Sequence, residues 1–362
     1  MIRKLAPIVV LVAMLVLPGG ASARVPHDFF GMSPQGGLEK EDFELMRDAG
    51  VRSVRLPLLW SQIERFSPFL VEPDWSGFDR EVALAADQGI RAFAFVTSSP
   101  AWIAPVPRDE PANRHARRAW GSFLRAAARR YGSEGSFWRA NPDLPYLPIR
   151  DWEIWNEENI VTFSRRPDPR RYAALLRVSG SVLHGADPEA RVILGGLFGR
   201  PLQIPPNVAS GDYLSRIYRA RHVKRYFDGV ALHPYVADAH AMRAQIINLR
   251  RVMRVHHDAS TPLYVTELGW GSDSFESRWE RGLYGQAREL NEAFSMLAGH
   301  RSAWRIGGVW WFSWVDSPYC QFCDSAGLLT AKREAKPSWY RFNAWTGGDP
   351  DTVPRASFGP GD

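Results

Sequence analysis

The stretch Asp151-Trp152-Glu153-Ile154-Trp155-Asn156-Glu157 is a short β-like run that stops at an acid. A second run, Pro262-Leu263-Tyr264-Val265-Thr266-Glu267, ends in the same way. Other runs, such as Ala92-Phe93-Ala94-Phe95-Val96, are almost continuously apolar. Such runs are typical of parallel strands that are buried on both faces. The sequence therefore predicts a parallel sheet with two glutamates at the ends of its strands.

Amphipathic stretches alternate with these strands along the chain. The predicted strands are residues 29–32, 51–59, 90–97, 149–156, 191–196, 227–233, 263–267 and 306–314. The predicted helices are residues 38–49, 78–88, 113–131, 169–184, 211–221, 239–257 and 277–298. This alternation predicts an α/β fold, the (β/α)8 TIM barrel. An open doubly wound sheet is disfavoured because no Gly-rich fingerprint follows the first strand.

The N-terminus has the pattern of an export signal. Arg3 and Lys4 precede the apolar residues 5–17, and Ala21-Ser22-Ala23 fits a cleavage site. The apolar run is shorter than the ~20 residues of a membrane span. We expect a signal peptide at 1–23, a barrel domain at 24–345, a flexible tail at 346–362, and a secreted protein without stable membrane insertion. An uncleaved N-terminal anchor is the alternative.

Charge and cysteine content exclude some partners. The formal net charge is only +6 over 362 residues, and the arginine clusters at 114–130 and 216–225 have the spacing of solvated helix faces. No nucleic-acid motif accompanies them, so we expect no nucleic-acid partner. The two cysteines, Cys320 and Cys323, favour a local disulfide over a zinc site, because zinc requires four ligands.

In such a barrel, the carboxyl ends of the strands surround the active site. Acids, an amide, an arginine, a phenol and several indoles lie at or near the ends of the predicted strands, namely Arg55, Trp60, Ser98, Ser99, Trp102, Asn156, Glu157, His233, Tyr235, Glu267, Trp270, Trp310, Trp311 and Trp314. Hydrolysis of a glycosidic bond requires two carboxyl groups, and indole faces can stack on sugar rings. The pattern therefore favours a glycoside hydrolase.

The chain also resembles a known family. Trp155-Asn156-Glu157 and Thr266-Glu267-Leu268-Gly269-Trp270 resemble the two catalytic signatures of clan A glycoside hydrolases, and residues 151–196 are similar to family 39 in particular, with family 5 cellulase-like enzymes next. The resemblance covers roughly residues 28–345. It implies retaining hydrolysis of β-glycosides without a cofactor.

The resemblance also assigns roles to single residues. Glu157 would be the general acid/base and Glu267 the nucleophile. Asn156 would bind the sugar 2-hydroxyl, and Tyr235 of the motif His233-Pro234-Tyr235 would hydrogen-bond Glu267. Arg55 resembles the arginine that keeps the nucleophile ionised.

Two features depart from a simple match. Glu158 stands where relatives often have proline, and it would either raise the pKa of Glu157 by repulsion or point to solvent. Strand alternation also places Asn156 and Glu157 on opposite faces, so both can serve only if the strand ends or bulges there.

The remaining site predictions concern sugar contacts. We expect Trp314 to be the sugar platform, with Trp311 and Trp102 as further contacts, and His233 to lie in the substrate site. Glu153, in mid-strand, is predicted to be a buried ion-pair partner. Trp310 and Trp311 alternate across their strand, so at least one should be in the core.

The resulting hypothesis is a monomeric, exported retaining hydrolase that acts on a poly- or oligosaccharide and requires no cofactor or metal. Two alternatives stay open at this point. One is an inactive barrel that only binds carbohydrate. The other is a metal-dependent barrel hydrolase, which is disfavoured because, of the His and Asp ligands that it would place at strand ends, only His233 falls there clearly.

Overall fold

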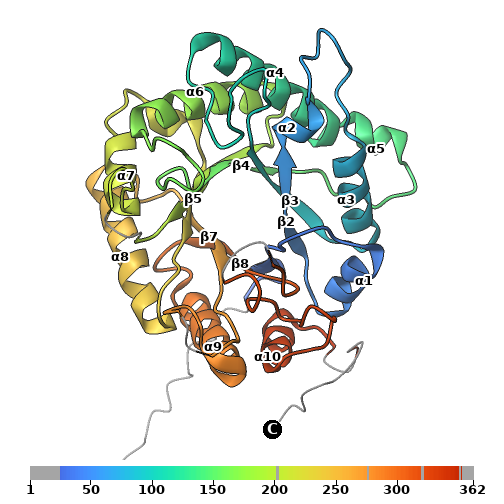
Figure 1. The fold of residues 1–362 in the computed structure, drawn as a ribbon, viewed down its shortest axis with the longest axis vertical. Helices are drawn as coiled ribbons and strands as arrows, with labels where there is room; N and C mark the ends of the chain where they lie inside the picture. The colour runs from blue at the N-terminus through green and yellow to red at the C-terminus, as the bar shows by residue number, and fades with distance from the viewer. Residues whose placement is uncertain (1–24, 201–203, 275–276, 319–321, 350–351, 353–362) are drawn as a thin grey trace, which may run out of the picture.

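The computed structural model describes residues 25–200, 204–274, 277–318, 322–349 and 352. Eight parallel strands close into a barrel in which each strand pairs with its neighbour in the sequence (Figure 1). The strands are β1 (Phe30–Met32), β2 (Ser53–Leu59), β3 (Arg91–Thr97), β4 (Asp151–Asn156), β5 (Arg191–Phe198), β6 (Gly229–His233), β7 (Leu263–Leu268) and β8 (Ile306–Trp311). The predicted (β/α)8 fold is confirmed.

A ring of helices surrounds the barrel (Figure 1). The principal helices are α1 (Lys40–Asp48), α3 (Ser76–Asp87), α4 (Arg114–Tyr131), α6 (Pro169–Ala186), α7 (Ser210–Ile217), α8 (Ala239–Val255), α9 (Gly282–His300) and α10 (Pro337–Thr346). Shorter segments are α2 (Trp60–Ile63), α5 (Ser136–Ala140) and the 3-10 helix η1 (Val223–Tyr226). Each strand is followed by a principal helix, so the chain completes eight strand–helix units.

The sequence pattern misses α10. Pro337 begins this helix, and Gly347 ends it with a φ of 75°, a backbone angle that glycine adopts readily. The helix buries Ser338 and Asn343 together with Trp339 and Phe342, and these buried polar residues blur the amphipathic pattern. With α10, which continues to Thr346, the last strand also has its helix.

The amino-terminal end of the barrel is filled by large side chains. Phe93, Ile193, Ala231, Tyr264 and Trp310 form a cluster of buried residues, and the indole of Trp310 donates to Ser53 Oγ at 3.2 Å. Ser53 is the first residue of β2, so this cluster lies at the start of the strands. Polar side chains are therefore left to gather at the carboxyl ends.

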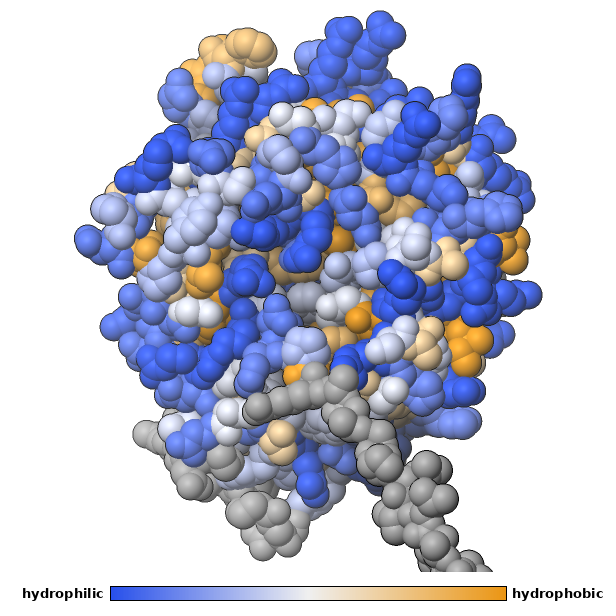
Figure 2. Space-filling view, turned by 180° about the vertical axis from the view of Figure 1, so that it is seen from behind, coloured by the Kyte–Doolittle hydropathy of each residue, from blue (hydrophilic) through white to orange (hydrophobic). Residues whose placement is uncertain are grey.

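The face of the molecule seen in Figure 2 is mostly hydrophilic. The arginines of α4 at positions 114, 118, 125 and 129 are exposed, as their helical spacing predicts. An apolar projection is visible at the upper edge of Figure 2, where the loop after α2 exposes Phe66, Phe69, Leu70 and Val71. Within the described part of the chain, none of the helices has the length and apolar character that a membrane crossing requires.

Some predictions fall on segments outside the described residues. The signal peptide at 1–23 and most of the tail at 346–362 are among them. Cys320 is another, so its disulfide with Cys323 stays a prediction.

Candidate active site

The barrel brings six predicted site residues to its carboxyl end. Arg55 comes from β2, Asn156 from the last position of β4 and His233 from the last position of β6, whereas Glu267 lies in β7. Glu157 follows β4 directly, and Tyr235 lies two residues after the end of β6. All six are less than a tenth exposed. Residues that are far apart in the sequence thus form one enclosed polar cluster.

The backbone at the end of β4 resolves the conflict between Asn156 and Glu157. Trp155 and Glu157 both have positive φ angles, 72° and 44°, a region that residues other than glycine seldom occupy. Strand pairing ends at Asn156, which lies opposite Gly196, and the Glu157 amide donates to the Gly196 carbonyl at 3.1 Å. The strict alternation of a strand is therefore broken, and both side chains reach the site, as the resemblance requires.

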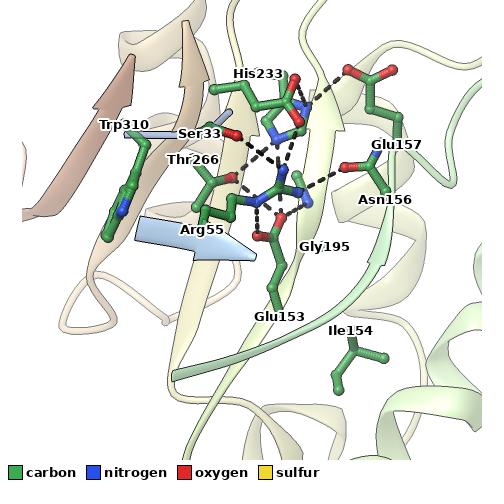
Figure 3. A network of polar contacts seen from close by, with 12 residues as sticks. Ser33, Arg55, Glu153, Ile154, Asn156, Glu157, Gly195, His233, Thr266 and Trp310 are labelled. Atoms are coloured by element: carbon green, nitrogen blue, oxygen red, sulfur yellow. Dashed lines mark hydrogen bonds and ion pairs between the residues drawn. The ribbon is translucent and has the colours of Figure 1, made fainter. Parts of the chain in front are cut away.

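Arg55 connects three polar groups (Figure 3). Its Nε donates to Glu153 Oε2 at 2.7 Å, its Nη1 to Glu267 Oε1 at 2.6 Å and its Nη2 to Asn156 Oδ1 at 2.7 Å. The guanidinium lies 3.9 Å from the centre of the Phe95 ring. A planar guanidinium can satisfy several acceptors at once, whereas a lysine ammonium on a flexible stem would not fit the same fork geometry. Glu153 is thus the buried ion-pair partner that was predicted.

Glu267 accepts hydrogen bonds at both of its oxygens. Arg55 donates to Oε1, and the Tyr235 hydroxyl donates to Oε2 at 2.8 Å. Burial raises the pKa of Glu267, while the positive charge of Arg55 and the Tyr235 hydrogen bond lower it. Both donors stabilise the ionised carboxylate.

His233 contacts Glu157 through one ring nitrogen and Thr266 through the other. Its Nδ1 is 2.8 Å from Glu157 Oε1, and its Nε2 is 3.0 Å from Thr266 Oγ1. Burial and the charge of Arg55 lower the pKa of His233 well below its usual range, so the ring is neutral near pH 7. Gly196 makes room for the ring, because a Cβ at that position would lie 1.9 Å from Nε2.

Glu157 has the environment of a protonated acid. Burial, followed by the charge of Glu267, raises its pKa well above the ordinary value, and Arg55 offsets part of that rise. Carboxylate oxygens of Glu157 and Glu267 lie within 4.8 Å of each other. Two carboxyl groups at this separation, one bound by a cation and the other next to a neutral imidazole, are suited to different roles.

Glu158 does not point to solvent, so that alternative is wrong. Its side chain is fully buried, and a Cβ on Gly195 would lie 2.6 Å from Glu158 Oε2. Burial raises the pKa of Glu158 well above the ordinary value. The charge of Glu158 contributes to the raised pKa of Glu157, as the other alternative predicts.

The structure corrects the prediction that Trp314 and Trp311 contact sugar, because both are fully buried. The Trp314 indole donates to Asp42 Oδ1 of α1 at 3.1 Å and packs against Trp339 of α10. Trp311 ends β8 and faces outward, where it contacts Phe294 of α9. Neither side chain presents a ring face to the site. α1 and α10 enclose Trp314, and α9 packs against Trp311.

Two other tryptophans also have structural contacts. Trp310 is buried as well, so both residues of this pair are in the core. Trp102 is half-buried, donates to the Glu64 carbonyl at 2.9 Å and packs edge-on against Trp60. Its role as a sugar contact stays a prediction.

The sequence analysis did not identify Thr266 or Phe312 as site residues. Thr266 contacts both His233 and Glu153. Phe312 packs edge-on against Tyr235, with ring centres 6.2 Å apart. Thr266 carried a usable signal, since a polar residue inside an apolar strand requires a buried partner. Phe312 carried none, because it is one of four aromatic residues in the run Trp310-Trp311-Phe312-Ser313-Trp314.

Glu157, His233 and Glu267 have donor atoms close enough together to hold a metal ion. However, Arg55 and Tyr235 already donate to Glu267, and Glu157 already contacts His233. A buried guanidinium 2.6 Å from the carboxylate repels a divalent cation. These contacts favour carboxylate chemistry over a metal centre.

Comparisons with known proteins agree with this geometry. No family model matches the chain. A β-xylosidase of Geobacillus stearothermophilus is 24% identical over 212 residues, which are 54% of this chain and 41% of that protein. A family 39 glycoside hydrolase from Bacteroides cellulosilyticus is 20% identical, with a TM-score of 0.62, over 89% of this chain and 63% of that one.

The chain is similar to the family 39 glycoside hydrolases of clan A. A monomeric β-xylosidase from Caulobacter crescentus also shares the fold, with 17% identity and a TM-score of 0.61 over 87% of this chain and 67% of that one. The predicted resemblance to family 39 is thereby confirmed. The chain spans about two fifths of the curated β-xylosidase and under two thirds of the Bacteroides enzyme.

Proposed function

We propose that the protein is a retaining glycoside hydrolase that cleaves β-glycosidic bonds, with Glu267 as nucleophile and Glu157 as general acid/base. The observation that carries the proposal is the pair of carboxylates, whose oxygens lie within 4.8 Å of each other. Retaining enzymes hold their two carboxyl groups about 5–5.5 Å apart, whereas inverting enzymes leave room for a water molecule at about 6.5–9.5 Å. The spacing supports retention.

The first step forms a bond between Glu267 and the anomeric carbon of the sugar. Glu157 gives its proton to the glycosidic oxygen as the bond to the leaving group breaks. Glu267 is suited to attack because Arg55 and Tyr235 favour its ionised form. Glu157 is suited to donate because burial and the nearby Glu267 favour its protonated form.

The second step releases the sugar. The Glu157 carboxylate takes a proton from a water molecule, whose oxygen attacks the anomeric carbon and breaks the bond to Glu267. Asn156, held by Arg55 Nη2, is placed to hydrogen-bond the substrate beside the reacting centre. The resemblance suggests the sugar 2-hydroxyl as its target.

The similarity to β-xylosidases makes β-xylosides the first substrates to test. We propose that the natural substrate is an oligo- or polysaccharide and that the protein is exported and monomeric. The test is a screen of residues 24–362 on chromogenic β-glycosides and β-glucans, with Glu267→Ala and Glu157→Gln as controls. We expect hydrolysis that Glu267→Ala abolishes. Hydrolysis that persists in Glu267→Ala would refute the nucleophile, and glycan binding without turnover would support the inactive carbohydrate-binding barrel instead.

A further inference from the structure

Four residues from β4, β7, β6 and the turn after β4 form a continuous hydrogen-bonded chain (Figure 3). It runs from Glu153 of β4 through Thr266 of β7 and His233 of β6 to Glu157, and we call it the relay. The Thr266 hydroxyl is 3.2 Å from Glu153 Oε1 and 3.0 Å from His233 Nε2, and His233 Nδ1 is 2.8 Å from Glu157 Oε1. All four residues are 5% exposed or less.

Glu153 is the fixed end of the relay. Its Oε2 accepts from Arg55 Nε at 2.7 Å and its Oε1 from the Gly196 amide at 2.6 Å. Both oxygens of Glu153 thus already accept a hydrogen bond from an N–H group, and they act as acceptors toward Thr266 as well. The Thr266 hydroxyl therefore donates its single proton to Glu153.

The direction of each remaining hydrogen bond follows from that donation. Because the Thr266 proton is used, Thr266 Oγ1 must accept from His233, which places the ring proton on Nε2. A neutral imidazole carries one N–H, so Nδ1 has a lone pair and must accept. Its neighbour, Glu157 Oε1, can then only be the donor of an O–H.

We propose that Thr266 and His233 are positioning residues that fix the imidazole tautomer, so that Nδ1 accepts the Glu157 O–H and keeps this acid protonated until the proton passes to the substrate. The catalytic role that this inference gives to the relay rests on the proposed function. The assignment of the His233 tautomer does not depend on that function. When Glu157 has given up its proton, its carboxylate faces a nitrogen lone pair. The relay thus disfavours the ionised acid and favours its reprotonation by water.

Other groups also act on Glu157. The charged and titratable side chains that face it are Glu267 of β7, Arg55 of β2, Glu153 of β4, Glu158 of the same turn, and His233 and Tyr235 from the end of β6. Substitution of Thr266 alters none of these charges. A change in the pH profile of a Thr266 variant therefore reports on the hydrogen-bond direction and not on a lost charge.

The test compares Thr266→Val with Thr266→Ser. Without a hydroxyl, Nε2 loses its acceptor, and the ring favours the tautomer in which Nδ1 donates to an ionised Glu157. We expect the alkaline limb of kcat/KM in Thr266→Val to move to lower pH by about one unit, a tenfold loss above neutral pH. Thr266→Ser should restore the wild-type profile. An unshifted limb in a folded Thr266→Val protein would overturn the proposal.

A second measurement does not depend on activity. Ring nitrogen-15 NMR of the wild type, with His233→Asn to identify the His233 signals, should show the Nε2–H tautomer near pH 6. The Nδ1–H tautomer in the wild type would overturn the relay even if the protein is an active hydrolase. If no glycoside is cleaved, the proposed function fails, while the NMR result still decides the relay and covers the case in which Thr266→Val does not fold.

Discussion

Arg55 Nη1 and Glu267 Oε1 lie 2.6 Å apart, although 212 residues separate them in the sequence. The contact is buried, with 1% of the Arg55 side chain and 12% of the Glu267 side chain exposed. Arg55 also pairs with Glu153. One cation thus balances two acids, and the whole site depends on the position of that cation.

Replacement of Arg55 is expected to affect both stability and activity. Arg55→Ala leaves Glu153 and Glu267 without their cation, and breaking a buried pair in this way costs about 3–5 kcal/mol. The pKa of Glu267 should rise, because Arg55 lowers it. The acid limb of kcat/KM should therefore move to higher pH, because Glu267 must be ionised to attack.

Arg55→Lys keeps the charge, but it is expected to lose much of the activity because one ammonium cannot match the three acceptors. Urea unfolding and pH–rate profiles provide the measurements. Arg52→Lys, at an exposed position, is the control and should behave like the wild type. Wild-type profiles in both Arg55 variants would show that the contact does not control the nucleophile.

Glu157→Gln tests the acid through its dependence on the leaving group. An amide cannot protonate the glycosidic oxygen, so turnover of alkyl glycosides or natural linkages should fall about 10²–10⁴-fold. Aryl glycosides with a strongly acidic phenol as leaving group need no proton, and their first step should be nearly unaffected. An equal loss on both kinds of substrate would contradict the role of Glu157 as the acid.

Gly196→Ala tests the packing of His233 against β5. A Cβ at position 196 would lie 1.9 Å from His233 Nε2, so the ring must move away from Thr266 and Glu157. We expect a destabilisation of about 1–3 kcal/mol from overpacking, with a loss of activity that exceeds any loss of folded protein. Gly185→Ala is the control, since a Cβ there meets no neighbour within 4 Å. A Gly196→Ala enzyme with normal activity would show that the position of His233 is unimportant.

Glu110 provides a prediction for stability against pH. The residue is buried, and burial raises its pKa from 4.5 to about 8. A raised pKa means that the folded state binds the proton more tightly than the unfolded state does. The stabilisation from this group is fully present below the unfolded pKa and is lost as pH rises through about 8.

Glu110→Gln should therefore become more stable relative to the wild type as the pH increases, by at most about 1.4 kcal/mol per pH unit. The measurement is urea unfolding at pH 5, 7 and 9, with the exposed Glu72→Gln as control. A constant difference between Glu110→Gln and the wild type across this range would mean that Glu110 titrates normally.

Local patterns were sufficient to predict most of the barrel. All eight strands and seven of the principal helices have a clear apolar pattern, whereas α10 buries Ser338 and Asn343 and lacks one. The tryptophans show the same limit. Trp314 was expected at the mouth because it follows a strand, but α10 and α1 enclose it, and that enclosure depends on a helix that the pattern did not reveal.

Site residues that belong to a sequence motif could be predicted. Residues that join the site only through tertiary contacts were harder to predict. The motifs around Glu157 and Glu267 led to both acids, and His233, Tyr235 and Arg55 lie beside them as expected. The positive φ angles of Trp155 and Glu157 had no sequence signal, because neither residue is a glycine. Thr266 acquires its contacts from β4 and β6, so its place in the relay could be recognised only in the folded chain.

The most direct test of the account is covalent trapping of the nucleophile. The wild type is incubated with the 2-deoxy-2-fluoro derivative of a β-glycoside that it cleaves, carrying a reactive leaving group, and the digested protein is mapped by mass spectrometry. The account predicts one added sugar on the peptide that contains Glu267, and none in Glu267→Ala. An active enzyme that gives no adduct, or an adduct on another residue, would contradict it.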